Sequence, residues 1–259
     1  MINWSFAPDK TPDSSEIPDK IQVNVESKSA LLALVADCLH NKQGFTIATL
    51  NLDHIVKLRH SDQFFQAYRR QTYVVADGNP IVWLSRIAGR RIELVPGSEL
   101  VKPLTAVAAK MDTPVALLGA TQETLDKAAD ALMATYPELR IVARIAPPYG
   151  FDPEGVEAQE CVDELAKSGA RLCFLALGAP KQEIFSVNAA ESLPHCGFVS
   201  IGASLDFIAG TQTRAPRIIR KLALEWLWRM LSNPRRLAYR YGACIAVLPE
   251  LIVQAVRAR

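Results

Sequence analysis

Tyr73-Val74-Val75-Ala76-Asp77-Gly78-Asn79-Pro80 runs from apolar, β-favouring residues into an Asp-Gly pair and a proline. This order predicts a buried strand whose carboxyl end meets a turn and the start of a helix. Asp77 then lies at the rim of a sheet, where open α/β proteins bind their ligands. The octapeptide leaves a simple turn-forming or helix-capping role for Asp77 open, because Asp before Gly is ordinary turn chemistry.

The same order of strand, turn and helix recurs along the chain. Near-continuous apolar runs, typical of strands buried on both faces, alternate with segments of helical periodicity. We therefore predict an α/β fold with a mainly parallel sheet covered by helices on both faces. The expected strands are 45–50, 73–76, 114–118, 140–146, 172–177 and 198–201, with a shorter candidate at 21–25.

Polar side chains follow four of these strands. Because the carboxyl ends of parallel strands lie on one side of a sheet, residues far apart in sequence can converge there on one crevice. Each of them could instead be a solvated loop residue or a helix cap. The candidates are Thr49 and Asn51, Asp77 and Asn79, Lys181 and Gln182, and Asp206.

Composition favours a globular protein. Of the 259 residues, 49% are apolar, which is enough for a full core. The five cysteines never form a C-x-x-C pair, which indicates reduced thiols in the cytosol and argues against a zinc site. Residues 1–20 are polar and predict a flexible arm, with no signal peptide. The run 241–256 contains Pro249 and Glu250 and does not predict a transmembrane helix.

Charge is unevenly distributed along the chain. Residues 214–259 carry a net charge of +8 and the preceding residues −6. The basic end requires an anionic partner: ligand phosphates, an anionic membrane or nucleic acid. We expect two helices there, interrupted at Asn233-Pro234, whose Arg and Trp content suits a diphosphate or a membrane interface. The alternative is a solvated charged face on helices that pack against the body.

An ordered set of motifs resembles the WecG/TagA/CpsF family of bacterial glycosyltransferases (glycosyltransferase family 26). Within this family, Asn51-Leu52-Asp53-His54 and Asp77-Gly78-Asn79-Pro80 are most similar to GumM-like glucosyltransferases of exopolysaccharide assembly. The motifs are Thr49-x-Asn51, Ala76-Asp77-Gly78, Gly97-Ser98-Glu99-Leu100, Gly178-x-Pro180-Lys181-Gln182-Glu183, Gly202-Ala203-x-x-Asp206-Phe207-x-x-Gly210, Arg214-Ala215-Pro216, Leu224-Glu225-Trp226-Leu227-Trp228-Arg229 and Pro234-Arg235-Arg236-Leu237-x-x-Arg240-Tyr241.

The resemblance implies a Rossmann-like catalytic domain, which we place at 21–210, and a basic helical membrane-proximal appendage at 211–259. It implies inverting transfer from a UDP-sugar to a polyprenyl-diphosphate-linked sugar at the inner face of the cytoplasmic membrane, by a peripheral protein that needs no metal or other cofactor. Asp77 would be the general base. Thr49, Asn51, Asn79, Gln182 and Asp206 would bind substrate, and Arg229, Arg236 and Arg240 would meet the diphosphate. Leu94 departs from the family, which often has arginine there, so Arg90 or Arg91 would have to replace it.

Glucose from UDP-glucose, in a β-1,4 linkage, is the favoured donor sugar, and N-acetylmannosamine or its uronic acid is the alternative. A NAD-dependent oxidoreductase is disfavoured because no G-x-G-x-x-G follows an expected strand. A nucleic-acid-binding module is disfavoured by the acidic body, so we expect no nucleic-acid partner. The apolar end of the chain makes a homo-oligomer a further possibility.

Overall fold

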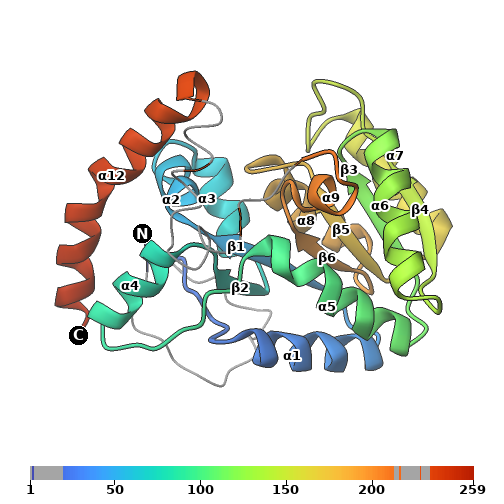
Figure 1. Ribbon diagram of the computed structural model, residues 1–259, viewed down its shortest axis with the longest axis horizontal. Coiled ribbons are helices and arrows are strands. Elements are labelled where there is room, and N and C mark those ends of the chain that lie inside the picture. Colours follow the sequence, from blue (N-terminus) through green and yellow to red (C-terminus); the bar gives the residue numbers. More distant parts are fainter. Residues whose placement is uncertain (1, 3–19, 213–215, 217–227, 229–233) are drawn as a thin grey trace.

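The computed structural model describes residues 2, 20–212, 216, 228 and 234–259. Within these residues, six strands form one sheet with the order β2-β1-β6-β5-β3-β4, and every pairing in it is parallel (Figure 1). The predicted α/β class is therefore confirmed. The strands are β1 Phe45–Leu50, β2 Tyr73–Ala76, β3 Val115–Gly119, β4 Ile141–Ile145, β5 Leu172–Ala176 and β6 Gly197–Ser200.

Helices cover both faces of the sheet. Alternate strand residues point to opposite faces, so Val75 packs with α1, α5 and α6, whereas Val74 and Ala76 pack with α2, α3 and α4. Phe198 and Leu175 lie on that second face under α7 and α8. The helices are α1 Lys28–His40, α2 Leu52–Leu58, α3 Asp62–Arg69, α4 Asn79–Ile87, α5 Gly97–Lys110, α6 Gln122–Thr135, α7 Val156–Ser168, α8 Lys181–Ser192, α9 Ser204–Ile208 and α12 Pro234–Arg257.

The register of β1 and β2 sets the position of the first rim residues. Leu50 pairs with Ala76, and the Asp77 N–H donates to the Leu50 carbonyl at 2.7 Å. The segments that follow β1 and β2 leave the sheet side by side, so Asn51 and Asp77 are neighbours. Since β2, β1, β6 and β5 are consecutive in the sheet, all four predicted polar strand ends lie along one stretch of its edge.

The predicted strand at 21–25 is wrong. Ile21 makes only an isolated bridge to Ile2. The segment contacts the edge of β2 through the backbone N–H groups of Asn24 and Val25, which both donate to the Val74 carbonyl, and through the Asn24 side chain. That amide donates to the Thr72 carbonyl at 2.8 Å and accepts from the Val74 N–H at 2.7 Å. The side chain satisfies edge groups of β2 that a strand would otherwise pair, which explains why an apolar run ends here without a ladder.

The last helix, α12, lies at one end of the molecule next to α4 and α2 (Figure 1). Leu251 and Ala255 are buried in the same apolar cluster as Ile55 and Leu84. The helical end of the chain is thus confirmed, while the domain boundaries at 20 and 210 stay predictions. Most of the expected arm and of the first tail helix lies outside the described residues. None of the helices in the described ranges has an apolar stretch that could span a bilayer.

Candidate active site

Asn51 and Asp77 meet at the carboxyl ends of β1 and β2. The Asn51 side-chain oxygen accepts the His54 N–H at 3.0 Å, which caps the start of α2. Its amide nitrogen therefore faces the other way and donates a long hydrogen bond to Asp77 Oδ2 at 3.4 Å. The cap fixes the amide orientation, so the residue after β1 presents an N–H donor to a half-buried carboxylate just after β2.

Thr49 and Asn79 flank this pair. Thr49 is buried in β1, and its methyl group lies 3.5 Å from the position that a Cβ on Gly97 would occupy at the start of α5. Asn79 is the first residue of α4 and follows Gly78, whose φ of 112° favours glycine. The turn that the octapeptide predicts is thus present, and Asp77 lies outside the helix that the turn starts.

Gln182 joins the loops after β5 and β6. Its side-chain oxygen accepts the Gly178 N–H at 3.2 Å and the Gly202 N–H at 3.1 Å, and its nitrogen donates to Glu183 Oε1 at 2.8 Å. Only 3% of the residue is exposed. Gln182 therefore braces two adjacent strand ends, and its amide keeps one N–H beyond that bound to Glu183.

The other predicted residues are more dispersed. Asp206, in α9, is half-buried and accepts from the Thr211 hydroxyl at 3.3 Å. Arg229 lies outside the described residues, and the side chain of Arg236 in α12 lies outside them too. Arg240 reaches the rim from α12, where its guanidinium binds both oxygens of Asp53 at 2.5 and 2.7 Å. The structure thus brings Arg240 to the first turn of α2, two residues after Asn51.

The model of the family described as "Glycosyl transferase WecG/TagA/CpsF family" matches residues 19–259. This chain belongs to the WecG/TagA/CpsF family. Membership makes it a glycosyltransferase that acts on lipid-linked sugars. Because the match runs through α12, the basic end of the chain is part of the family's common unit.

Three functional candidates of the transferase were missed by sequence reasoning: Asp53, Lys57 and Glu183. Asp53 and Glu183 each lie in the first turn of a helix, where an acidic residue is ordinary, and only long-range contacts distinguish them. Burial raises the pKa of Glu183 to about 7, against opposing hydrogen bonds from Gln182 and the backbone. Its Oε2 has no hydrogen-bond partner among the described residues.

A buried aromatic pair lies beneath the transferase's rim. His54 Nδ1 is 3.2 Å from the Tyr68 hydroxyl, and both residues are buried. Burial, together with the nearby charge of Lys57, lowers the pKa of His54 to about 3, so the ring is neutral at physiological pH. Burial also raises the pKa of Tyr68, as do the nearby charges of Glu183 and Asp77. This pair supports α2 from below and carries no charge of its own.

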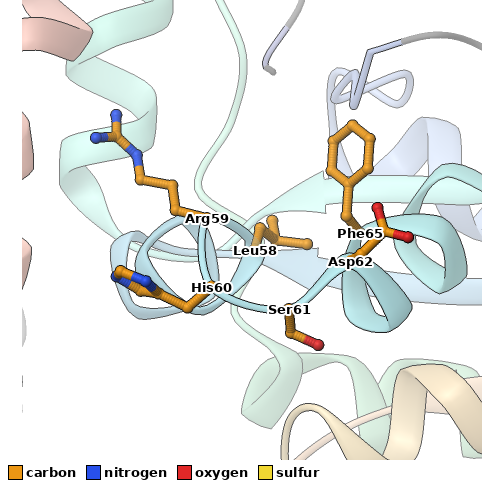
Figure 2. A pocket seen from close by; sticks show the side chains of 6 residues that line it. All are labelled: Leu58, Arg59, His60, Ser61, Asp62 and Phe65. Carbon is orange, nitrogen blue, oxygen red and sulfur yellow. The ribbon is translucent and has the colours of Figure 1, made fainter.

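The described residues offer no obvious metal centre, and one of their surface hollows lies close to α2 but away from the rim. Nowhere in the described part of the chain do three His, Cys, Asp or Glu side chains gather. The prediction that the transferase works without a metal stays a prediction. The hollow lies around the α2–α3 turn, at the opposite end of α2 from Asn51 (Figure 2). It is lined by Leu58, Arg59, His60, Ser61, Asp62 and Phe65, none of which is a predicted site residue.

Proposed function

We propose that this protein is an inverting glucosyltransferase that moves glucose from UDP-glucose, in a β-1,4 linkage, onto a polyprenyl-diphosphate-linked sugar. This role is that of a GumM-like enzyme in exopolysaccharide repeat-unit assembly. Family membership supports transfer to a lipid-linked sugar. The observation that carries the rest is the Asn51–Asp77 contact, which presents one oriented carboxylate at the edge of a parallel sheet.

Inverting transfer requires a base for the attacking hydroxyl. Asp77 would accept that proton while the acceptor oxygen bonds to C1 of the donor sugar and the C1–O bond to the diphosphate breaks on the opposite face. The Asn51 amide holds the carboxylate in place and can also donate to the acceptor hydroxyl. Gln182, at the start of α8, would use its remaining N–H for the donor sugar.

Charge develops on the departing UDP and requires cations nearby. Arg240 and Lys57 both bind Asp53 at the rim and supply two positive charges there. Arg229 and Arg236 are predicted to join them from the same end of the chain. A guanidinium can meet two phosphate oxygens at once, so these residues could replace a metal ion at the diphosphate.

A donor screen tests the proposed specificity. With a short-chain polyprenyl-diphosphate-sugar acceptor, UDP-glucose is expected to give the highest kcat/KM, and UDP-N-acetylmannosamine and its uronic acid are the comparison donors. Product linkage and anomeric configuration are read by NMR. A higher kcat/KM with either N-acetylated donor would show that its sugar, and not glucose, is the one transferred. A product that keeps the anomeric configuration of the donor would contradict the role of Asp77 as the base. The rate is expected to survive EDTA; loss reversed by Mg²⁺ would contradict a metal-free site.

Peripheral binding to the inner face of the cytoplasmic membrane is supported by the outer face of α12. Ile245, Ile252, Val253 and Val256 are exposed there, opposite the buried Leu251 and Ala255. We expect the full chain to float with anionic liposomes and to bind heparin weakly. Replacing Ile252 and Val256 by serine should reduce flotation several-fold, because each removes buried apolar area at the interface. Unchanged flotation with strong heparin retention would favour a polyanion partner; self-association that disappears in the double variant would favour a homo-oligomer.

A further inference from the structure

Asp53 is bound by two cations from different parts of the chain. Arg240 Nε and Nη2 donate to its two oxygens at 2.5 and 2.7 Å, and Lys57 Nζ donates to Oδ2 at 2.9 Å. The carboxylate is only 12% exposed. Burial alone would raise the pKa of Asp53, but Lys57 and Arg240 together lower it below its ordinary value. Asp53 is therefore ionised at neutral pH, and the cluster has a net charge of +1.

The cluster connects three elements at the rim. Asp53 is two residues from Asn51, which contacts Asp77, and Arg240 comes from α12, 187 residues away in sequence. The Lys57 ammonium also donates to the Ala179 carbonyl at 3.1 Å, in the loop before Gln182. The two cations thus lie between the start of α2 and the loop that Gln182 braces.

The Asp53–Arg240 pair is one of several contacts that hold α12 in place. Leu251 and Ala255 already bury that helix against α2 and α4. A second ion pair, Arg59 with Glu250 at 2.8 Å, joins the same two helices further along, and such exposed pairs contribute little to stability. The contact with Asp53 therefore has a second effect besides docking α12, which is on the orientation of the Arg240 guanidinium.

A bidentate carboxylate fixes the plane of the Arg240 fork. Two of its five N–H groups bind Asp53, and within the described part of the chain Arg240 makes no other hydrogen bond. Its side chain is 45% exposed, so the remaining edge can reach a ligand. Pinning a long side chain before the ligand arrives removes part of the entropy that binding would otherwise lose.

We infer that Asp53 is a positioning residue, which holds Arg240 and Lys57 so that they bind the diphosphate of the nucleotide donor. This inference rests on the proposed function for the identity of the donor. The inference predicts that neutralising Asp53 changes the affinity for anions in the direction opposite to that expected from charge alone. Neutralising Asp53 raises the local charge from +1 to +2, which by Coulomb attraction alone would tighten anion binding. If Asp53 orients the fork, binding weakens instead.

Calorimetry on the full chain tests this with UDP and, separately, inorganic pyrophosphate. Asp53→Asn is expected to weaken both by about five- to tenfold, the loss associated with one unpinned side chain. In an Arg240→Ala background the same substitution should have a smaller effect, because only Lys57 is then left for Asp53 to position. Glu250→Gln is the matched control: it breaks the other α2–α12 ion pair and should leave both affinities unchanged.

Tighter or unchanged binding by Asp53→Asn would overturn the inference, and so would an equal loss in Glu250→Gln, which would show that α12 docking alone matters. If Asp53→Asn fails to fold, Arg240→Lys keeps the charge without the fork and should also weaken pyrophosphate binding; full affinity would contradict us. A wild-type chain that binds pyrophosphate but not UDP would contradict only the uridine donor. Binding of neither would overturn both proposals.

Discussion

Replacing Asp77 by asparagine is expected to lower turnover by about 10²- to 10⁴-fold, the contribution of a positioned general base. Asparagine has nearly the same shape, and its side-chain oxygen can still accept from Asn51 Nδ2. The fold and UDP binding should therefore be kept, while the proton acceptor is lost. The measurement is the single-turnover rate with the best donor of the screen, together with the dissociation constant for UDP.

The control for this variant is Asp62→Asn. Asp62 lies in the first turn of α3 and accepts only an exposed hydrogen bond from Gln66 among its described contacts, so its loss should leave turnover intact. Wild-type turnover in Asp77→Asn would rule out Asp77 as the base. A loss of both UDP binding and thermal stability would show instead that Asp77 is a structural turn residue, which is the alternative that the sequence left open.

Glu183→Gln is expected to stabilise the protein above neutral pH. Burial raises the Glu183 pKa from 4.5 to about 7, so the folded state keeps a proton that the unfolded state releases. The contribution of Glu183 to folding stability is thus fully present below pH 4.5 and is lost as pH rises through 7. The difference corresponds to a penalty on the order of 3 kcal/mol at pH 8. Glutamine cannot ionise, and its carbonyl oxygen can still accept from Gln182 Nε2.

The free energy of unfolding of both proteins, measured in urea from pH 5 to 8, checks this. His54 must be considered, because burial lowers its pKa to about 3 and its stabilising contribution is lost as pH falls below 6.5. Between pH 4.5 and 6.5 the Glu183 contribution to the free energy of unfolding falls with rising pH while the His54 contribution rises. The pH dependence of the wild-type protein alone therefore does not isolate Glu183. The difference between variant and wild type should grow from pH 5 to 8 in favour of the variant.

The matched control is Glu191→Gln, on the same helix. Its side chain is 69% exposed and pairs with Arg70, so its replacement should change the free energy of unfolding only slightly. A Glu183→Gln difference that does not change with pH would mean that Glu183 titrates as an ordinary carboxyl. In that case a partner, such as a water molecule on Oε2, stabilises its ionised form.

Deleting the end of the chain is a poorer test of the site than these substitutions. Leu251 and Ala255 of α12 fill the apolar cluster that also holds Ile55 and Leu84. A chain stopped near Gly210 would expose that cluster to water and lose stability together with any catalytic arginine. Point variants of Arg240 and its partner separate the two effects.

Most strands of the sheet were predictable because they are buried on both faces and therefore appear as continuous apolar runs. The edge strand β4 is only partly buried, but its residues are still mainly apolar. The run at 21–25 has the same appearance but forms no strand. The Asn24 side chain accepts the Val74 N–H, and the backbone bonds from Asn24 and Val25 both go to the Val74 carbonyl, so no ladder forms. Local periodicity measures burial and does not distinguish a strand from an extended segment lying against an edge.

The sequence by itself determined the parallel α/β sheet, the turn that starts α4 at Gly78, and the family. It also indicated that Asn51 and Asp77 lie on the same side of the sheet, because strand direction follows from strand–helix alternation. That their strands are neighbours was decided by the tertiary structure. Only the tertiary structure decided that Gln182 braces two loops, that Glu183 is sealed from water and that Asp53 holds Arg240. Those features arise from contacts between residues distant in sequence or from burial, and neither spacing nor residue type records which groups the packed chain brings together.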